Sequence, residues 1–333
     1  MPSWLRRGYD GGASGRERRL RFVTSKEQQD QDSPLREETP DSQTGSPDVS
    51  FGVSIVQFFL IPALVVVACV ALFMFFGWLV AEEKSSLDHL HDIKTGSATR
   101  RWQAAFELAK QLNNMERLEQ RSDADDIEGL VPGMIDVFET ADQDDPRVRR
   151  YMALALGHVR DPRAVPVLLG ALTDDDPETR IYSIWALGSL GDKRALVPLL
   201  ELAQDDDPGI RKMVVYSLGA LRAEEARDTL RAALEDYQMD VAWNAAIALA
   251  QLGDATGKER ILQMLDRGFL NTVAEMSDTQ RSDAMMTAMR GAVLLKDAQL
   301  RARLEDISAG DPDLKVRQAA FESLAQINKS NKE

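Results

Sequence analysis

Hydrophobic and polar positions divide the chain into three regions. Residues 1–50 contain few apolar residues and no sustained period, residues 51–81 are almost wholly apolar, and the rest places apolar residues at helical spacing. A segment as polar as 1–50 buries too little surface to offset the entropy of ordering, so we expect a disordered tail there. We expect residues 82–96 to form a short linker before the periodic region of 97–330.

The segment from 51 to 81 contains no charged residue and a single strongly polar one, Gln57. About 20 consecutive apolar residues are enough for a helix to cross the hydrocarbon core of a bilayer. A signal peptide would have a shorter apolar region close to the N-terminus, so an uncleaved anchor fits this pattern better. The sequence therefore predicts one transmembrane helix, which places 51–81 in the lipid bilayer.

The distribution of lysine and arginine bears on the orientation of this single-pass segment. Close to the segment, Lys84, Lys94 and Arg100 outnumber Arg36, but the whole tail before it holds 8 basic residues. Long domains cross membranes largely regardless of their charge. We therefore favour a cytoplasmic N-terminal tail with the periodic region on the opposite side of the membrane.

The periodic region repeats itself every 31 residues. Asp145–Asp175 aligns without gaps on Asp176–Asp206, and the pattern continues through Asp207–Tyr237 and, more loosely, Gln238–Gly268. Each unit contains two stretches with apolar residues at helical spacing, separated by a turn. The first stretch begins at a proline such as Pro177.

Apolar residues recur at equivalent positions of successive units. One unit alone has too little surface to bury its apolar stripe, but stacked units form a continuous core. Small residues at one position of each unit would allow neighbouring helices to approach closely: Gly157, Gly188, Gly219 and Ala250. The predicted fold is all-α, an α–α superhelix (solenoid) of about 5–6 helix-pair repeats, preceded by the transmembrane helix.

One unit carries a recognisable pattern. Residues 176–200 read D-P-x-x-R-x-x-x-x-x-A-L-G-x-L-G-D-x-R-A-x-x-P-L-L. This pattern resembles the HEAT-like repeats of the phycobilisome-lyase type, within the HEAT and armadillo superfamily, and the resemblance covers about 70% of the chain. The superfamily includes scaffolds, adaptors, chromophore lyases and a metal hydroxylase, so the resemblance implies a fold more specifically than a function.

Runs of three aspartates precede the proline at two unit boundaries. Asp176 and Asp207 stand directly before the proline, which is the signature of a helix N-cap followed by proline at the first helical position. The aspartates before them can form an acidic ridge for a basic partner: Asp174, Asp175, Asp205 and Asp206. A divalent-cation site is the third reading, although the turn glycine of a calcium loop is missing.

Arginine recurs with the same period. The repeated positions are Arg149, Arg180 and Arg211. The resemblance implies that such an arginine pairs with an acidic residue at a turn, so we expect Arg180 to pair with Asp192 or Asp161 in the middle of a repeat. A site for an anionic ligand is the alternative interpretation.

Composition narrows the classes of partner and of chemistry. Residues 1–52 carry 8 basic and 9 acidic groups, which leaves 32 basic and 45 acidic groups, a net charge of −13, to the rest of the chain. An acidic surface repels phosphate backbones, so we expect no nucleic-acid partner. The single cysteine, Cys69, lies in the apolar segment and permits neither an internal disulfide nor a thiolate metal site.

Catalytic motifs are sparse in this sequence. The deoxyhypusine-hydroxylase branch of the superfamily uses His-Glu pairs to bind iron, and none of the three histidines, His89, His91 and His158, is followed by glutamate. A glycine-rich phosphate loop and a nucleophile elbow are also missing from the sequence. We therefore predict that the chain is not an enzyme and uses neither a cofactor nor a metal.

Repeat arrays of this kind act through an extended surface. We expect the second helix of each pair to line the concave face, where Arg163, Arg194 and Glu201 would contact a partner. The sequence thus predicts a membrane-anchored scaffold or adaptor for a protein partner, as an accessory subunit of a membrane complex. The alternative is a lyase-like or chaperone-like protein that handles a small ligand in the concave groove.

Overall fold

The computed structural model describes residues 61–80, 84–117, 124–141, 145–274 and 276–330 of the chain. These residues belong to two compact units, one that begins at Lys84 and one that precedes it. The tail predicted to be disordered, 1–50, lies outside the described residues. We call the unit that begins at Lys84 the repeat unit.

Helix α3 (Ile61–Val80) forms part of the predicted transmembrane segment. Its described side chains are exposed, with Leu64 at 64% and Phe73 at 81% of their full accessibility. Residues 51–60 and 81 of that segment lie outside the described residues. Among the residues that the structure describes, no helix combines the length and the apolarity that a membrane crossing requires.

The repeat unit is an all-α helical repeat solenoid, which confirms that part of the predicted fold; the preceding transmembrane helix stays a prediction. Its described residues form fifteen α-helices: α4 (Ser86–Thr95), α5 (Ala98–Arg117), α6 (Ala124–Thr140), α7 (Arg147–Val159), α8 (Val165–Gly170), α9 (Pro177–Leu190), α10 (Leu196–Glu201), α11 (Pro208–Leu221), α12 (Arg227–Ala233), α13 (Met239–Gln251), α14 (Lys258–Leu265), α15 (Arg267–Thr272), α16 (Asp278–Leu295), α17 (Ala298–Gly310) and α18 (Leu314–Ser330).

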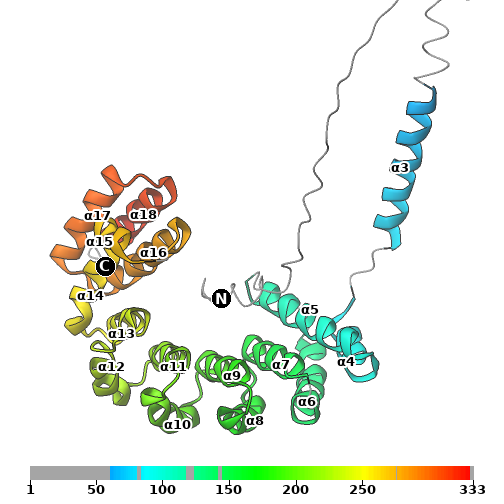
Figure 1. The fold of residues 1–333 in the computed structure, drawn as a ribbon, viewed down its shortest axis with the longest axis horizontal. Coiled ribbons are helices and arrows are strands. Elements are labelled where there is room, and N and C mark those ends of the chain that lie inside the picture. The colour runs from blue at the N-terminus through cyan, green and yellow to red at the C-terminus, as the bar shows by residue number, and fades with distance from the viewer. Residues whose placement is uncertain (1–60, 81–83, 118–123, 142–144, 275, 331–333) are drawn as a thin grey trace, which may run out of the picture. The chain divides into compact units, whose positions relative to one another are not determined.

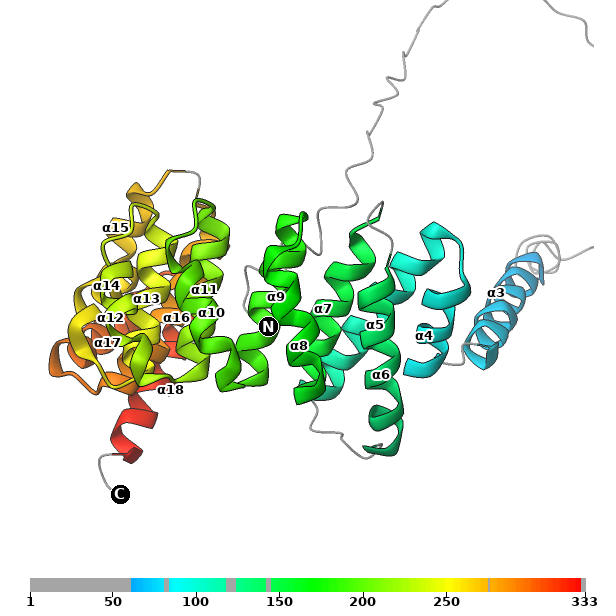
Figure 2. The same ribbon diagram turned by 90° about the horizontal axis from the view of Figure 1, so that it is seen from below.

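The helices of the repeat unit form two layers (Figure 1). The inner layer, on the concave side, consists of the first helix of each pair: α5, α7, α9, α11, α13, α16 and α18. Figure 2 shows α7, α9 and α11 of this layer side by side. The outer layer holds the shorter second helices, among them α8, α10 and α12. The prediction that second helices line the concave face is therefore wrong.

Small residues explain why the row curves toward the first helices. A Cβ atom on Gly188 of α9 would lie 2.7 Å from the Cβ of Ser217 on α11, and one on Gly219 would lie 2.6 Å from the Cβ of Ala248 on α13. First helices therefore touch almost backbone to backbone. A stack bends toward the side on which its members are closest, so this side becomes concave.

Aspartates begin the helices of each unit. Asp176 accepts a hydrogen bond from the backbone N–H of Thr179 at 2.8 Å, and Asp207 accepts one from Gly209 at 2.7 Å. The proline that follows each aspartate is the first residue of α9 or α11 and needs no hydrogen-bond partner for its nitrogen. Both carboxylates satisfy N–H groups that the helix leaves unpaired.

The periodic arginines form an arginine ladder, a series of ion pairs along the stack, but their partners differ from the predicted ones. Arg149 binds Asp174 through Nε and Nη2 at 3.0 and 2.6 Å, and Arg211 binds Asp236 at 2.8 and 3.1 Å. Each of these arginines thus pairs with an aspartate at the next unit boundary. Arg180 donates from Nη1 to the backbone carbonyl of Asp174 at 2.8 Å.

The predicted partners of Arg180, Asp161 and Asp192, have other roles. Each caps a short 3-10 turn in the middle of its repeat, and each pairs with the arginine two residues later, Arg163 or Arg194. Arg180 lies in the first turn of α9, and the ten helical residues that follow it, about 15 Å of helix, separate it from the turn that contains Asp192. The Arg180 guanidinium therefore lies at the boundary between two repeat units and does not reach the turn in the middle of the repeat.

The repeat unit begins earlier than predicted. Residues 86–95, expected to be linker, form α4, which packs against α5 and α6 and buries Leu90 and Ile93. Ser85 and Asp88 form a reciprocal capping box at its start. Because α4 spans 10 residues and lacks the 31-residue pattern, the periodicity alone gave no sign of it.

Candidate functional site

The inner layer leaves one face of each first helix open. Outer helices and neighbouring first helices bury residues such as Met152 and Leu187 completely, whereas Tyr151, Lys212 and Asn244 stay half-buried. We call the open face of α5, α7, α9, α11 and α13 the inner surface. This surface is the candidate functional site of the repeat unit.

Aromatic side chains gather at the N-terminal part of the inner layer. Phe106 of α5 and Tyr151 of α7 meet edge to face, with ring centroids 5.4 Å apart. The guanidinium of Arg147 lies 4.7 Å from the ring of Trp102. Phe106, Tyr151 and Trp102 are half-buried, and aromatic groups with an adjacent cation are favourable contact points for a partner.

Between α7 and α9, the next two helices of the inner layer, the aromatic rings are more deeply buried. His158 of α7 and Trp185 of α9 meet with ring centroids 4.9 Å apart. Burial, reinforced by the nearby Glu178, raises the pKa of Tyr182 to about 12. Burial also raises the pKa of Tyr151. Both tyrosines therefore stay neutral at physiological pH and keep a hydroxyl that can donate.

Ion pairs connect neighbouring first helices. Arg150 of α7 binds both Asp176, at 2.7 and 2.5 Å, and Glu178, at 2.6 Å, at the start of α9. Lys212 of α11 binds Asp240 of α13 at 2.9 Å. These pairs hold charged groups of both signs in a fixed order along the inner surface.

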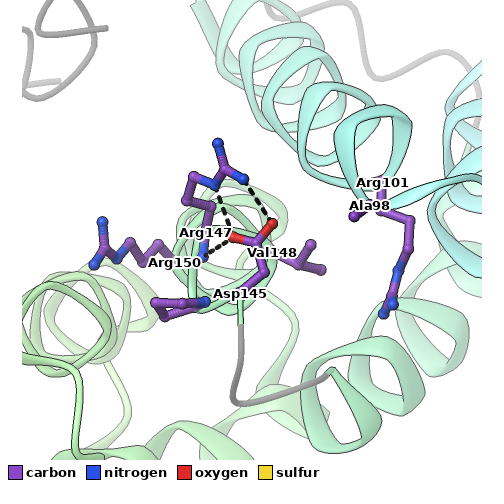
Figure 3. Close-up of a pocket in the computed structure, with 7 residues that line it drawn as sticks. Ala98, Arg101, Asp145, Arg147, Val148 and Arg150 are labelled. Carbon is purple, nitrogen blue, oxygen red and sulfur yellow. Dashed lines mark hydrogen bonds and ion pairs between the residues drawn. The ribbon is translucent and has the colours of Figure 1, made fainter.

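A cavity of about 610 Å³ opens between the starts of α5 and α7 (Figure 3). Its walls include three arginines and one carboxylate: Arg101, Arg147, Arg150 and Asp145. Asp145 binds Nε of Arg147 at 2.7 Å, and this bond is the main reason that the pKa of Asp145 lies below its usual range. Arg150 is already bound to Asp176 and Glu178. Arg101, which donates from Nε to the Ile93 carbonyl at 3.1 Å, is the lining arginine that pairs with no carboxylate of the described residues, and it can donate further to an anionic group.

The sequence prediction did not include these pocket residues. Arg147 and Arg150 flank the periodic Arg149 in the stretch "DPRVRR", and only the periodic position drew attention. The sequence does mark these two arginines as departures from the repeat, because the next unit has Glu178 and Ile181 at the equivalent positions. Residues that break a repeat are more informative about a site than residues that keep it.

The aspartates predicted to bind a partner separate into two kinds. Asp174 is half-buried between Arg149 and the backbone N–H of Asp176, and Asp205 accepts from the N–H of Asp207 at 2.8 Å. Asp175 is exposed, as is its counterpart one repeat later, Asp206. A role for these two in docking stays a prediction.

The remaining predicted contacts lie away from the inner surface. Arg163 and Arg194 lie in the mid-repeat turns and pair with Asp161 and Asp192. Glu201 ends α10 of the outer layer. The structure therefore does not bring these three side chains together with the aromatic cluster. Their proposed partner role rested on the wrong assignment of the concave face.

We expect Asp174→Asn to lower the free energy of unfolding by about 1–3 kcal/mol, because it removes the charged acceptor of the half-buried Arg149 guanidinium. Asp175→Asn, one residue away and exposed, should change it by less than about 0.5 kcal/mol. Urea unfolding followed by circular dichroism measures both variants. Equal effects of the two substitutions would contradict the structural role of Asp174.

Potential metal ligands do not cluster in the described part of the chain, where histidine, cysteine and acidic residues form no group of three or more. The cysteine, Cys69, lies exposed on α3. The expectation that the chain uses no metal or cofactor stays a prediction.

Comparison with known proteins agrees with the repeat architecture. Residues 135–218 and 196–277 match the family described as HEAT repeats. This part of the chain, the middle of the repeat unit, is therefore similar in sequence to HEAT repeats. No curated protein matches it in sequence.

Two solved structures illustrate the similarity. In the complex of CpcE and CpcF of phycocyanin lyase from Nostoc sp. PCC7120, the similar chain is 20% identical, with 74% of this chain and 88% of that chain covered and a TM-score of 0.53. A designed armadillo repeat protein in complex with the peptide (KR)4 is 13% identical, with 73% and 100% covered and a TM-score of 0.38. At 20% identity the likeness to the chain of the CpcE and CpcF complex is one of fold.

Proposed function

We propose that this protein is a scaffold that binds a protein partner along the inner surface. The observation that carries the proposal is the uninterrupted row of first helices, α5 to α13, whose open faces present half-buried aromatic and charged side chains. Solenoids use such extended concave surfaces to bind partners. Aromatic residues with arginine beside them are the groups that most often dominate binding energy in protein interfaces.

The proposal places the scaffold at a membrane, as an accessory subunit of a membrane complex. Its support is the uncharged segment 51–81 and the exposed apolar side chains of α3, which water solvates poorly. The N-terminal tail would lie in the cytoplasm and the repeat unit on the opposite side. The phycocyanin lyase structure, a complex of CpcE and CpcF, is a precedent for a similar fold that works within a protein assembly.

A second candidate function rests on the arginine-lined cavity between α5 and α7. Its volume of about 610 Å³ falls within the range of small-molecule sites. A lyase-like or chaperone-like role would place an anionic ligand there. The inner-surface proposal is favoured because the aromatic cluster and the ion pairs extend over several repeats, which is more than one small ligand can contact.

We expect the double variant Tyr151→Ala, Lys212→Ala to reduce capture of a stoichiometric partner by about tenfold or more, because both side chains belong to the inner surface. The full-length protein is extracted from membranes with detergent, and its co-purifying proteins are quantified by mass spectrometry. Release of the protein without detergent would refute the membrane anchor.

The matched control changes two exposed residues of the outer layer, Val197→Ser and Glu201→Ala. It should leave capture unchanged, and both variants should keep the helical signal of the wild type. Loss of capture in the outer-layer variant alone would move the binding surface to the convex side. Absence of any stoichiometric protein, together with loss of a bound anion in Arg101→Ala, would favour the second candidate.

A further inference from the structure

The last described helix, α18, lies at the end of the inner layer (Figure 1). One of its faces carries exposed apolar side chains. Leu314 is exposed at 69% and Phe321 at 65% of full accessibility. Ala325, one turn further along, is exposed as well. Exposed large apolar side chains that gather on one face of a helix mark an interaction surface.

The register of α18 within the repeat identifies the exposed face. Arg317 donates from Nη1 to the carbonyl oxygen of Asp311, six residues earlier, at 3.2 Å, as Arg180 of α9 does to Asp174 at 2.8 Å. Arg317 is therefore the equivalent of Arg180. With this alignment Phe321 corresponds to Ile184.

In the internal repeats the equivalent position is buried inside the stack. The equivalent residues are all fully buried: Ala153, Ile184, Val215 and Ala246. The position one turn later in α9, Gly188, touches Ser217 of α11, and its equivalent in α18 is Ala325. Phe321 and Ala325 thus lie on the face that would receive another helix of the stack.

The other end of the array is closed. Helix α4 packs on α5 and buries Leu90 and Ile93. The two ends of the repeat unit therefore differ, because one carries its own cover and the other presents a large aromatic side chain to solvent.

The distribution of charge on α18 indicates what covers this face. Leu314, Gln318, Phe321 and Ala325 follow each other at steps of four and three residues and form one stripe, flanked by the exposed Lys315 and Glu322. When two such helices pack antiparallel about a two-fold axis that passes between Gln318 and Ala319, Lys315 of each copy faces Glu322 of the other. The face is therefore complementary to itself in charge as well as in apolar character.

We propose that the α18 face binds the α18 face of a second copy, which makes the protein a symmetric dimer joined at the C-terminal ends of its repeat units. A contact between two helices buries less area than a typical stable interface, so a dissociation constant on the order of micromolar or weaker is expected. The inner surfaces of both copies stay open in this dimer. The inference does not depend on which partner the inner surface binds.

A charge-reversal exchange tests this dimer. The full-length protein in detergent is studied by sedimentation velocity, corrected for bound detergent, over a range of concentrations. Wild type should show reversible dimers, and Phe321→Ala, Lys315→Glu and Glu322→Lys should each weaken them by about tenfold or more. An equimolar mixture of Lys315→Glu and Glu322→Lys copies, with different tags, should restore dimerisation, because every flanking pair then joins opposite charges.

The control Asp306→Lys makes the same charge change as Glu322→Lys on an exposed residue of α17 and should leave dimerisation unchanged. Restoration in the mixture also excludes misfolding as the cause of the single-variant effects. The proposal is overturned if wild type is monomeric throughout, if Phe321→Ala associates as wild type does, if the mixture stays monomeric, or if another protein occupies this face.

Discussion

Arg211→Ala is expected to destabilise the repeat unit by about 3–5 kcal/mol, the range typical of breaking a buried ion pair. The Arg211 side chain is 7% accessible and its partner Asp236 is 11% accessible. The same guanidinium donates to the carbonyl oxygens of Asp205 and Asp206 at 2.8 and 3.0 Å and lies 4.8 Å from the ring of Tyr237. Alanine leaves a buried carboxylate and two carbonyl groups without their donor.

Chemical unfolding followed by circular dichroism gives the free-energy difference. The matched control is Arg301→Ala on α17, whose guanidinium pairs with the exposed Glu305 at 3.1 Å. Such a surface pair contributes about 0.5 kcal/mol or less. A loss in Arg211→Ala no larger than that of the control would show that the ladder does not stabilise the stack.

The pH dependence of the wild type provides a second measurement of this ion pair. The hydrogen bonds from Arg211 hold the pKa of Asp236 below its usual range. A carboxyl with a lowered folded-state pKa stabilises the protein above its unfolded pKa of about 3.9 and loses that stabilisation as the pH falls through the folded value. Arg211→Ala should therefore lose less stability than wild type between about pH 4 and pH 2. An unchanged acid dependence would argue against the pair.

Gly188→Ala is expected to cost about 1–3 kcal/mol, as overpacking of a tight core does. A Cβ at this position meets the Cβ of Ser217 at 2.7 Å and its backbone Cα at 2.8 Å. Because the obstacle includes the backbone of α11, a change of rotamer does not relieve it. Helices α9 and α11 must move apart, which also disturbs the hydrogen bond from the Ser217 hydroxyl to the Ile184 carbonyl, 2.9 Å long.

Gly170→Ala is the control for this substitution. Gly170 ends α8 in the outer layer, and a Cβ atom there meets no atom within 4 Å. Alanine should be neutral or stabilising by up to about 1 kcal/mol, because it restricts the unfolded chain. Thermal unfolding of both variants separates the two cases. If Gly188→Ala also proved neutral, close packing of first helices would not be the cause of the curvature.

Much of the fold followed from residues that are close together in the sequence. Asp176 and Pro177 predict the start of a helix because capping depends on neighbours within one turn. The period of 31 predicts stacked helix pairs because each unit repeats the same pattern of apolar and turn residues. These signals are local, so the sequence alone contains them.

The candidate site was less predictable for the opposite reason. The Arg149 side chain reaches Asp174 across 25 residues, and the cavity joins Arg101 to Arg150 from two different helices. The spacing of residues along the chain does not show whether a long arginine side chain reaches the mid-repeat turn or the turn at the unit boundary. Residues of α4 escaped prediction because that helix stands outside the repeat and depends on tertiary packing for its stability.

The all-α class, the repeat and the residues that begin its helices can be read from the sequence. Helix packing sets which layer is concave, which aspartate each arginine binds, and that Phe321 is exposed while its equivalents Ile184 and Val215 are buried. Curvature, ion-pair partners and exposure of this kind depend on distances between helices. Those distances result from the summed contacts of the stack, such as that of Gly188 with Ser217, and no single unit contains them.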